Sequence, residues 1–381
     1  MNSNETLLNN ARLVLGNEVL TGHVVLRDGR IAAIGRGASV SPAAVDLDGD
    51  LLLPGLVEVH TDNLERHVMP RPRVNFPMQS ALQAHDAEIA SAGITTVLDA
   101  IGVGDPYGDG FRSRDQSALL EVLDRLEAAG ALRAEHLIHV RCELPAENAQ
   151  ALFDAFSRSR RLRLISLMDH TPGQRQWTDI EHARVYYTGK KGWSDARFDE
   201  EVRVAPERQA RYATPNRAWF TAFARERGIA LATHDDTTLA HVDEAQALGA
   251  TMSEFPTTLE AARHARALGL STVAGAPNVV RGGSHSGNVS AIALASAGVL
   301  DALSSDYVPS SLLQAAWKLQ QDAGYSLPEA VRVVSRAPAL ACGLGDRGEI
   351  AVGLKADLVR VVEVDGLPSV REVFRDGRRV A

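Results

Sequence analysis

The sequence predicts an α/β protein whose main part is a TIM-like (β/α)8 barrel, with a small β-sandwich domain built from both chain termini. Strand-like runs alternate with helical runs through the middle of the chain, and eight such strands can be counted from Leu56 onward. Both ends of the chain instead show short alternating strands with glycine turns. Repeated strand–helix units predict a parallel sheet, and eight of them predict a closed barrel.

The two ends of the chain are expected to form one unit. The stretch "ARLVLGNEVLTGHVVLRDGRIAAIG" alternates apolar and polar residues between Gly and Asn turns, as antiparallel strands do. The tail, "GEIAVGLKADLVRVVEVDGLPSVREVFRDGRRV", returns to the same pattern. We therefore expect residues 1–53 and 345–381 to form a composite β domain, with the barrel, residues 54–344, inserted between them.

Eight apolar runs supply the predicted barrel strands. The first four are "LVEVHTD", "ITTVLDA", "HLIHVRCEL" and "LRLISLMDH". After a longer polar and aromatic connection, about residues 171–227, come "IALATHDD", "ATMSEFP", "STVAGAP" and "ALSSDYVP". Helical runs such as "QSALLEVLDRLEAAG" separate most of them, and no fixed-period repeat interrupts the series.

The composition excludes several classes of protein. A formal charge of -8 over 381 residues argues against nucleic-acid binding, which needs a basic surface. Two cysteines, Cys142 and Cys342, cannot supply a disulfide framework or a thiolate zinc site. The start "MNSNETLLNN" lacks the features of a secretory signal, and no apolar run approaches the ~18 residues of a membrane span. A soluble cytoplasmic protein without a membrane or nucleic-acid partner is expected.

Histidines and carboxylates gather where the predicted strands end, which is where barrels build their active sites. They are His60, Asp62, Asp99, Glu143, Asp169, His170, His234, Asp235, Asp236, Glu254 and Asp306. His60 and Asp62, two apart on a strand, share a face. Imidazole and carboxylate together suit zinc, manganese or a similar divalent ion.

Each of these residues also has a simpler interpretation. A lone histidine at a strand end is more often a hydrogen-bonded structural residue than a ligand, and Asp99 and Asp236 could be helix N-caps or loop residues. Their gathering on one rim of the barrel, at the ends of five different strands, favours a metal site.

Several long motifs resemble the amidohydrolase superfamily, and the resemblance covers essentially the whole chain. They are the first β unit, "PGLVEVHTD", the eight-strand alternation, "DALSSDYVP" and "GEIAVGLKADLV". Most members carry His-x-His on the first strand, whereas this chain has His60-Thr61-Asp62. The strings "HTDNLERH" with "PRP", and "GAPNVVRGGSHSGNVSA" followed by "SSDYVPSSLLQAA", are similar to one branch, the triphosphate diphosphatases of the carbon–phosphorus lyase pathway.

The resemblance implies a metal-dependent hydrolase with two divalent ions, zinc in the first place, with manganese and iron as alternatives. The implied ligands are His60, Asp62, Glu143, His170, His234 and Asp306. Asp306 would also act as general base. Many members bridge their metals with a carboxylated lysine on the fourth strand, but "LRLISLMDH" holds no lysine, which favours Glu143.

Three basic segments are candidates for binding substrate phosphates. "NVVRGGSHSGN" supplies Arg281, Gly282, Gly283, Ser284 and His285 ahead of a predicted helix start, which favours anions. "YYTGKKGW" supplies Lys190 and Lys191, and "MPRPRV" supplies Arg71 and Arg73. The simpler accounts are a glycine turn for the first segment and a solvated charged turn for the lysines.

The branch implies a phosphorylated ribose phosphonate as substrate, hydrolysed at its triphosphate to the 5-phosphate and pyrophosphate. It also allows a homo-oligomer, since superfamily barrels often assemble. Two alternatives differ in kind. One is an amidase or deacylase that attacks a C–N bond on the same barrel, and the missing His-x-His weighs against it. The other is a non-catalytic scaffold, which the complete set of candidate ligands disfavours.

Overall fold

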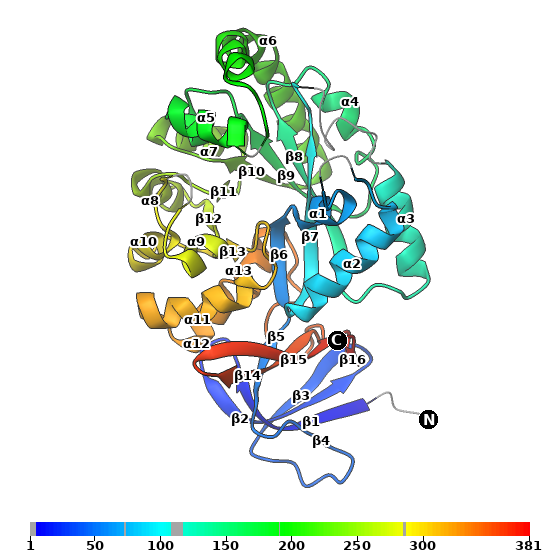
Figure 1. The fold of residues 1–381 in the computed structure, drawn as a ribbon. Coiled ribbons are helices and arrows are strands. Elements are labelled where there is room, and N and C mark those ends of the chain that lie inside the picture. Colours follow the sequence, from blue (N-terminus) through cyan, green and yellow to red (C-terminus); the bar gives the residue numbers. More distant parts are fainter. Residues whose placement is uncertain (1–4, 72–73, 108–116, 190, 285–286) are drawn as a thin grey trace.

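The computed structural model describes residues 5–71, 74–107, 117–189, 191–284 and 287–381. Its larger part is a sheet of eight parallel strands that follow one another in sequence order (Figure 1). These strands are β6 (Leu56–Thr61), β7 (Ile94–Val103), β8 (Glu135–Glu143), β9 (Leu162–Met168), β10 (Ala230–His234), β11 (Met252–Glu254), β12 (Ser271–Gly275) and β13 (Ala302–Ser304). A parallel bridge from Thr61 to Asp306 joins the first strand to the chain after the last. The predicted barrel is confirmed.

The barrel strands are buried on both sides, which explains their nearly continuous apolar sequences. All ten residues of β7 are buried, for example. One set of side chains packs inside the barrel and includes Val57, Leu98, Leu137 and Leu164. The other set packs outward against the helices. The candidate site residues His60, Glu143, His234 and Glu254 stand at or next to the carboxyl ends of their strands, at the mouth of the barrel.

Helices surround the barrel and connect its strands (Figure 1). They are α1 (Asn63–Val68), α2 (Met78–Ser91), α3 (Ser117–Ala128), α4 (Ala149–Phe153), α5 (Ile180–Gly189), α6 (Asp195–Arg227), α7 (Leu239–Leu248), α8 (Leu259–Ala267), α9 (Ala276–Arg281), α10 (Ala291–Ser296), α11 (Ser311–Ala323), α12 (Leu327–Arg332) and α13 (Arg336–Ala341). Five of these helices begin with a Ser or Thr whose hydroxyl accepts the N3 amide. These residues are Ser194 before α6, Thr238 before α7, Thr258 before α8, Ser290 before α10 and Ser326 before α12.

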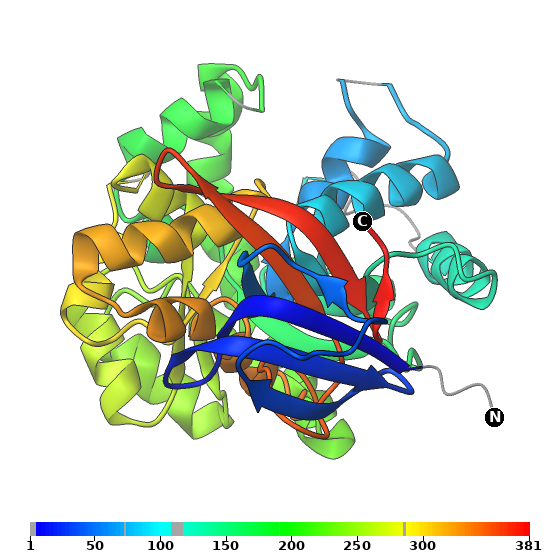
Figure 2. The same ribbon diagram turned by 90° about the horizontal axis from the view of Figure 1, so that it is seen from below.

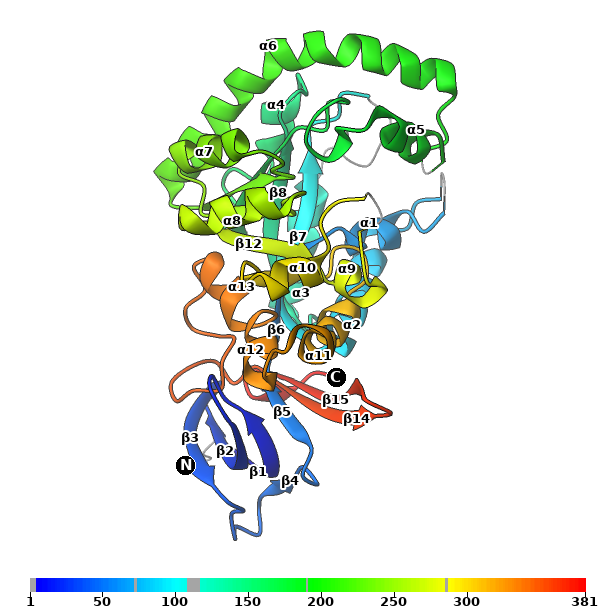
Figure 3. The same ribbon diagram turned by 90° about the vertical axis from the view of Figure 1, so that its left-hand side faces the viewer.

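The long connection after β9 is more ordered than its sequence suggests. It contains the 3-10 turn Arg175–Trp177, helix α5 and the 33-residue helix α6. Helix α6 contains Pro206 and Pro215, which remove backbone donors and bend a helix. Figure 3 shows α6 as a curved helix across the end of the molecule opposite the terminal strands. Those two prolines, and a strongly polar composition, hide the helix from a periodicity analysis.

The strands from the two chain ends form a second, mixed sheet, as predicted (Figure 2). They are β1 (Glu5–Val14), β2 (Val19–Arg27), β3 (Arg30–Arg36), β4 (Val45–Asp46), β5 (Leu51–Pro54), β14 (Leu358–Val364), β15 (Leu367–Arg375) and β16 (Arg378–Arg379). Strand β5 lies between β1 and β14 and so joins the two ends. Its chain continues through Gly55 into β6. A Cβ at Gly55 would lie 2.2 Å from Thr95 Oγ1, so only glycine fits there.

We propose that the domain boundaries fall at residues 53/54 and 344/345, where the chain passes between the two sheets. A partly buried ionic contact joins the two domains. Glu135, at the start of β8, accepts hydrogen bonds from Arg347 Nη1 at 2.6 Å and from Lys355 Nζ at 2.8 Å. Burial alone would raise the pKa of Glu135, but the charges of Arg347 and Lys355 outweigh it and lower the pKa to about 2.

Replacing Glu135 with glutamine should lower the free energy of unfolding by about 2–3 kcal/mol at pH 7, because it removes the carboxylate that Arg347 and Lys355 share. The folded-state pKa of Glu135 lies below its unfolded value, so its stabilisation is present above about pH 4.5 and fades as the pH falls toward 2. Urea unfolding followed by circular dichroism at pH 7 and pH 4 measures the difference. The exposed pair of Glu200 and Arg203 provides the control, since Glu200→Gln should leave stability nearly unchanged. If Glu135→Gln lowered the free energy of unfolding equally at pH 7 and pH 4, the lowered pKa of Glu135 would be wrong.

Candidate metal centre at the barrel mouth

Two histidines at the ends of separate barrel strands share one buried carboxylate. Glu254, the last residue of β11, lies with Oε1 3.2 Å from His60 Nδ1 and Oε2 3.5 Å from His234 Nδ1. The two imidazole rings are stacked, with centroids 5.6 Å apart. When each Nδ1 carries the proton for this contact, each Nε2 is left with a lone pair for a metal ion.

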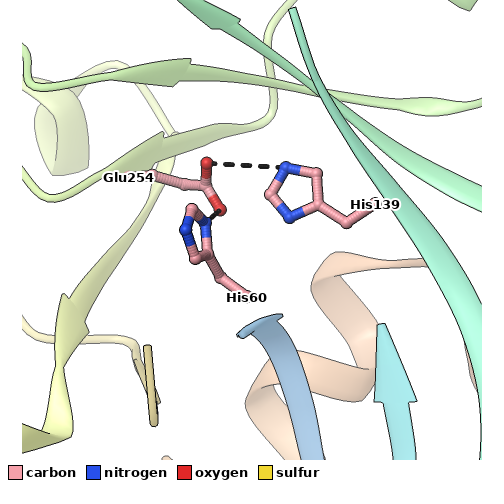
Figure 4. A group of neighbouring side chains, drawn as sticks. All are labelled: His60, His139 and Glu254. Carbon is pink, nitrogen blue, oxygen red and sulfur yellow. Dashed lines mark hydrogen bonds and ion pairs between the residues drawn. The ribbon is translucent and has the colours of Figure 1, made fainter. Parts of the chain in front are cut away.

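A third histidine, His139, contacts Glu254 inside the barrel. Figure 4 shows His60, His139 and Glu254 pointing toward one another from β6, β8 and β11. His139 Nδ1 donates to the Val59 carbonyl at 2.9 Å, and Ser166 Oγ lies between His139 Nε2 and the Glu254 carboxylate. Burial lowers the pKa of His139 to about 3, so this imidazole is neutral. Burial alone would raise the pKa of Glu254, but His139, His60 and His234 keep it well below its usual range.

A second group lies beside the first. Glu143, the last residue of β8, accepts hydrogen bonds from His170 Nδ1 at 2.5 Å and from the His170 amide at 2.9 Å. His170 Nε2 and His234 Nε2 lie 4.0 and 3.5 Å from Asp235 Oδ2. Ligand atoms of His170, His234 and Asp235 all fall within 4.8 Å of one another. Two imidazole nitrogens and a carboxylate oxygen thus converge on one space.

Asp62 and Asp306 reach the mouth from the first strand and from the chain after the last. The Asp306 amide donates to the His60 carbonyl at 3.1 Å, and the Asp62 amide donates to the Asp306 carbonyl at 3.0 Å. Asp306 has a left-handed backbone with φ of 54°, a conformation that costs free energy and recurs at functional sites. The Asp62 side chain is 27% exposed. The structure therefore brings all six predicted ligands to one end of the barrel.

Glu58 joins the end of β6 to the chain that follows β13, next to His60 and Asp306. Its two carboxyl oxygens accept hydrogen bonds from the His60 amide at 2.7 Å and from the Ser305 amide at 2.6 Å. Complete burial raises the pKa of Glu58 to about 8. The carboxyl group joins β6 to the chain after β13 directly below the candidate ligands.

The donor set fits a divalent metal ion. Three imidazoles and four carboxylates are the ligand types that zinc and related ions take. The Nδ1 atoms of His60, His170 and His234 each face a glutamate, which is the arrangement that orients histidine ligands in metalloenzymes. Their other ring nitrogens are left for metal binding.

The residues expected to bind phosphate lie further out. Arg281 is exposed at the end of α9, and Lys191 and Arg71 are exposed in connections. Gly282 ends α9 with φ of 82°, and α10 begins only at Ala291, whose amide donates to Asn278 Oδ1 at 3.0 Å. The predicted anion-binding helix start is thus already partnered. Gly283 and Ser284 follow in the loop, whereas Lys190, Arg73 and His285 lie outside the described residues.

Sequence reasoning missed two residues of the mouth, His139 and Arg141, and it listed Asp235 and Glu254 without giving them a role. Asp235 and Glu254 stand at strand ends, so their positions were visible, but their contacts depend on which strands become neighbours. For His139 and Arg141 a usable signal existed. Both alternate with Glu143 along "HVRCE", and residues two apart on a strand share a face.

Asp99 belongs to a separate buried cluster and does not cap a helix. Its carboxylate lies 2.7 Å from His85 Nε2 and 2.8 Å from His136 Nδ1, and Asp86 lies 3.3 Å from His136 Nε2. The group has metal-ligand spacing as well. Burial alone would lower the pKa of His136, but Asp99 and Asp86 raise it to about 9. We interpret the cluster as an internal ionic network, because a charged His136 lies between the carboxylates of Asp86 and Asp99.

Replacing Glu254 with glutamine should weaken metal binding by about 10–100-fold, the range typical when a supporting partner of a histidine ligand is lost. The amide cannot hold both His60 and His234 in the same tautomer. Competition with a chromophoric chelator measures the affinity. Glu260→Gln, in the first turn of α8, is the control. An unchanged affinity in the Glu254 variant would contradict the supporting role.

Comparisons with known proteins identify the family of this chain. The model of the amidohydrolase family matches residues 78–381. The chain is 45% identical over 376 residues to the alpha-D-ribose 1-methylphosphonate 5-triphosphate diphosphatase of Escherichia coli (strain K12), covering 98% of this chain and all of that protein.

Solved structures share the fold at low sequence identity. Molinate hydrolase aligns with a TM-score of 0.66 at 15% identity, over 100% of this chain and 95% of its own. N-acetylglucosamine-6-phosphate deacetylase from Pasteurella multocida aligns with a TM-score of 0.63 at 14% identity, over 98% and 99%. Among the described residues, no helix is long and apolar enough to cross a membrane. The family match and the full-length relative together show that this chain belongs to the amidohydrolase family.

Proposed function

We propose that this chain hydrolyses α-D-ribose 1-methylphosphonate 5-triphosphate to the 5-phosphate and pyrophosphate, as a step in phosphonate catabolism. The substrate comes from the Escherichia coli relative, whose name gives this activity and whose full length aligns at 45% identity. The observation that supports metal-dependent hydrolysis is the arrangement of histidines at the mouth of the barrel. At this mouth, Glu254 accepts from His60 and His234, and Glu143 accepts from His170, each through Nδ1. The Nε2 atom of each imidazole is therefore left for a metal ion.

We assign two divalent ions, zinc in the first place, to one set of ligands. The set is His60, Asp62, Glu143, His170, His234 and Asp306, to which the structure adds Asp235 as a candidate. When bound, such ions lower the pKa of water and stabilise charge on phosphoryl oxygens. Manganese and iron are the alternatives, since the same donors accept them.

The chain's own residues supply the proton transfer and the anion binding. Asp306 accepts the proton of the attacking water, which adds to the phosphorus nearest the ribose. The bond from that phosphorus to the bridging oxygen breaks, and pyrophosphate leaves in line with the attack. The rim segment from Arg281 to His285, with Arg71, Lys190 and Lys191, is proposed to bind the outer phosphates and the phosphonate.

The test is product analysis with the metal-loaded protein. We expect phosphorus-31 spectroscopy to show pyrophosphate released from the ribose phosphonate triphosphate, with slower turnover of ATP. Protein stripped with a chelator should be inactive and should recover when zinc or manganese is returned. An amide such as N-acetylglucosamine 6-phosphate is assayed beside it. Turnover of the amide without phosphoryl hydrolysis would replace the proposal with an amidase.

A further inference from the structure

Arg141 lies on β8 between His139 and Glu143, at the mouth of the barrel. It follows His139 and precedes Glu143 by two positions each on β8, so the three side chains share the inner face of the strand. The alternate residues Val140 and Cys142 pack outward in the apolar layer under the helices, which fixes this assignment. Arg141 is only 7% exposed.

The guanidinium of Arg141 is poorly satisfied by the protein. Its Nε is buried and has no hydrogen-bond partner. Its Nη1 lies 4.0 Å from Asp62 Oδ2, at the outer limit of an ion pair. A guanidinium has five N–H donors, and leaving a buried donor such as Nε without an acceptor costs free energy.

The other buried arginines of the described chain each donate to at least two protein acceptors. Arg161 donates to Asp124, Glu127 and the His136 carbonyl, all within 3.0 Å. Arg175 donates to Asp236 and the His234 carbonyl at 2.9 Å each. Arg347 donates to Thr96, Asp346 and Glu135. Within the described part of the chain, Arg141 therefore differs from the other three buried arginines, because it lacks protein acceptors at hydrogen-bonding distance.

We propose that Arg141 binds the phosphoryl group that undergoes attack, the one nearest the ribose, through two of its non-bridging oxygens. Guanidinium presents paired donors that match phosphoryl oxygens, and it keeps its charge when buried. Arg141 is close to Asp62 and shares its strand face with Glu143, so a group bound to it stands at the level of the metal ligands. The exposed Arg281 is then left for the outer phosphates. This inference rests on the proposed function.

The position of Arg141 predicts its kinetic signature. Negative charge redistributes over the reacting phosphoryl oxygens in the transition state, and a fixed cation there acts mainly on kcat. A cation that only gathers the triphosphate would act mainly on KM. An arginine that only compensates Asp62 would act on metal binding. Three measurements therefore separate three roles.

The experiment compares Arg141→Met and Arg141→Lys with the wild type in metal content, kcat and KM. We expect Arg141→Met to keep its metal and to lose about 100–1,000-fold in kcat, the effect typical of removing one preformed donor to a developing charge. Lysine should restore a minor part, since it cannot form the paired contact. Guanidinium chloride at low millimolar concentration should partly rescue the methionine variant. Arg161→Lys, at the opposite end of the barrel, should keep the wild-type kcat.

The outcomes are separable. Loss of metal in both Arg141 variants, or a change in KM alone, would overturn the inference while leaving the diphosphatase activity of the wild type in place. A wild type without any triphosphate hydrolysis would overturn the proposed function itself. If Arg141→Met does not fold, the lysine variant, checked by circular dichroism, still decides, because wild-type kcat in it would reject a paired contact.

Discussion

Replacing Asp306 with asparagine should lower kcat by at least about a thousand-fold while the protein keeps its metal. Asparagine retains an oxygen for a metal ion and is nearly the same size, but its amide cannot accept the proton of the attacking water. The left-handed backbone at Asp306 also tolerates asparagine better than most residues. The measurement is steady-state pyrophosphate release together with elemental analysis of the same sample.

Asp301 provides a matched control for this substitution. It stands just before β13, at the opposite end of the strand from Asp306, and pairs with Arg266 on the outside of the barrel. Asp301→Asn should leave kcat unchanged in the folded protein. A near-normal kcat in Asp306→Asn would show that Asp306 is not the general base.

Replacing His60 with alanine should reduce metal content and activity together. His60 is 1% exposed and stacked against His234, so its loss removes a ligand and also frees Glu254 from one of its partners. Metal affinity should fall by more than about 100-fold, beyond the range for a supporting residue. Elemental analysis after dialysis, followed by assay with and without added zinc, measures both effects.

A partly exposed histidine of α8, His264, controls for nonspecific effects of removing an imidazole. His264 pairs with Asp243 on the surface, and His264→Ala should retain the full metal content. A His60→Ala protein that stays folded and fully loaded would exclude His60 as a ligand.

The barrel could be predicted because parallel strands buried on both sides have a distinctive sequence. Runs such as "ITTVLDA" are apolar throughout, and the polar residues that follow them mark one rim. His60, His170 and His234 could be selected on that basis. The composite terminal sheet was also predictable, because alternation returns at residues 345–381 after the helical units end.

The contacts that organise the mouth could not be predicted. Glu254 meets His60 only because β11 and β6 face each other across the barrel interior, which depends on the closure of the sheet. The helix expected to begin at Gly287 begins at Ala291 for a local reason. Ser290 and Asn278 already accept its first amides, so the helix begins later than its apolar pattern indicates.

The central claim is that the barrel mouth holds metal ions, and anomalous diffraction from crystals of the zinc-loaded protein tests it most directly. We predict anomalous peaks within bonding distance of the Nε2 atoms of His60, His170 and His234, at about 2.1 Å. A peak only at the buried His85–Asp99–His136 cluster, or no peak in an active, loaded sample, would contradict the account.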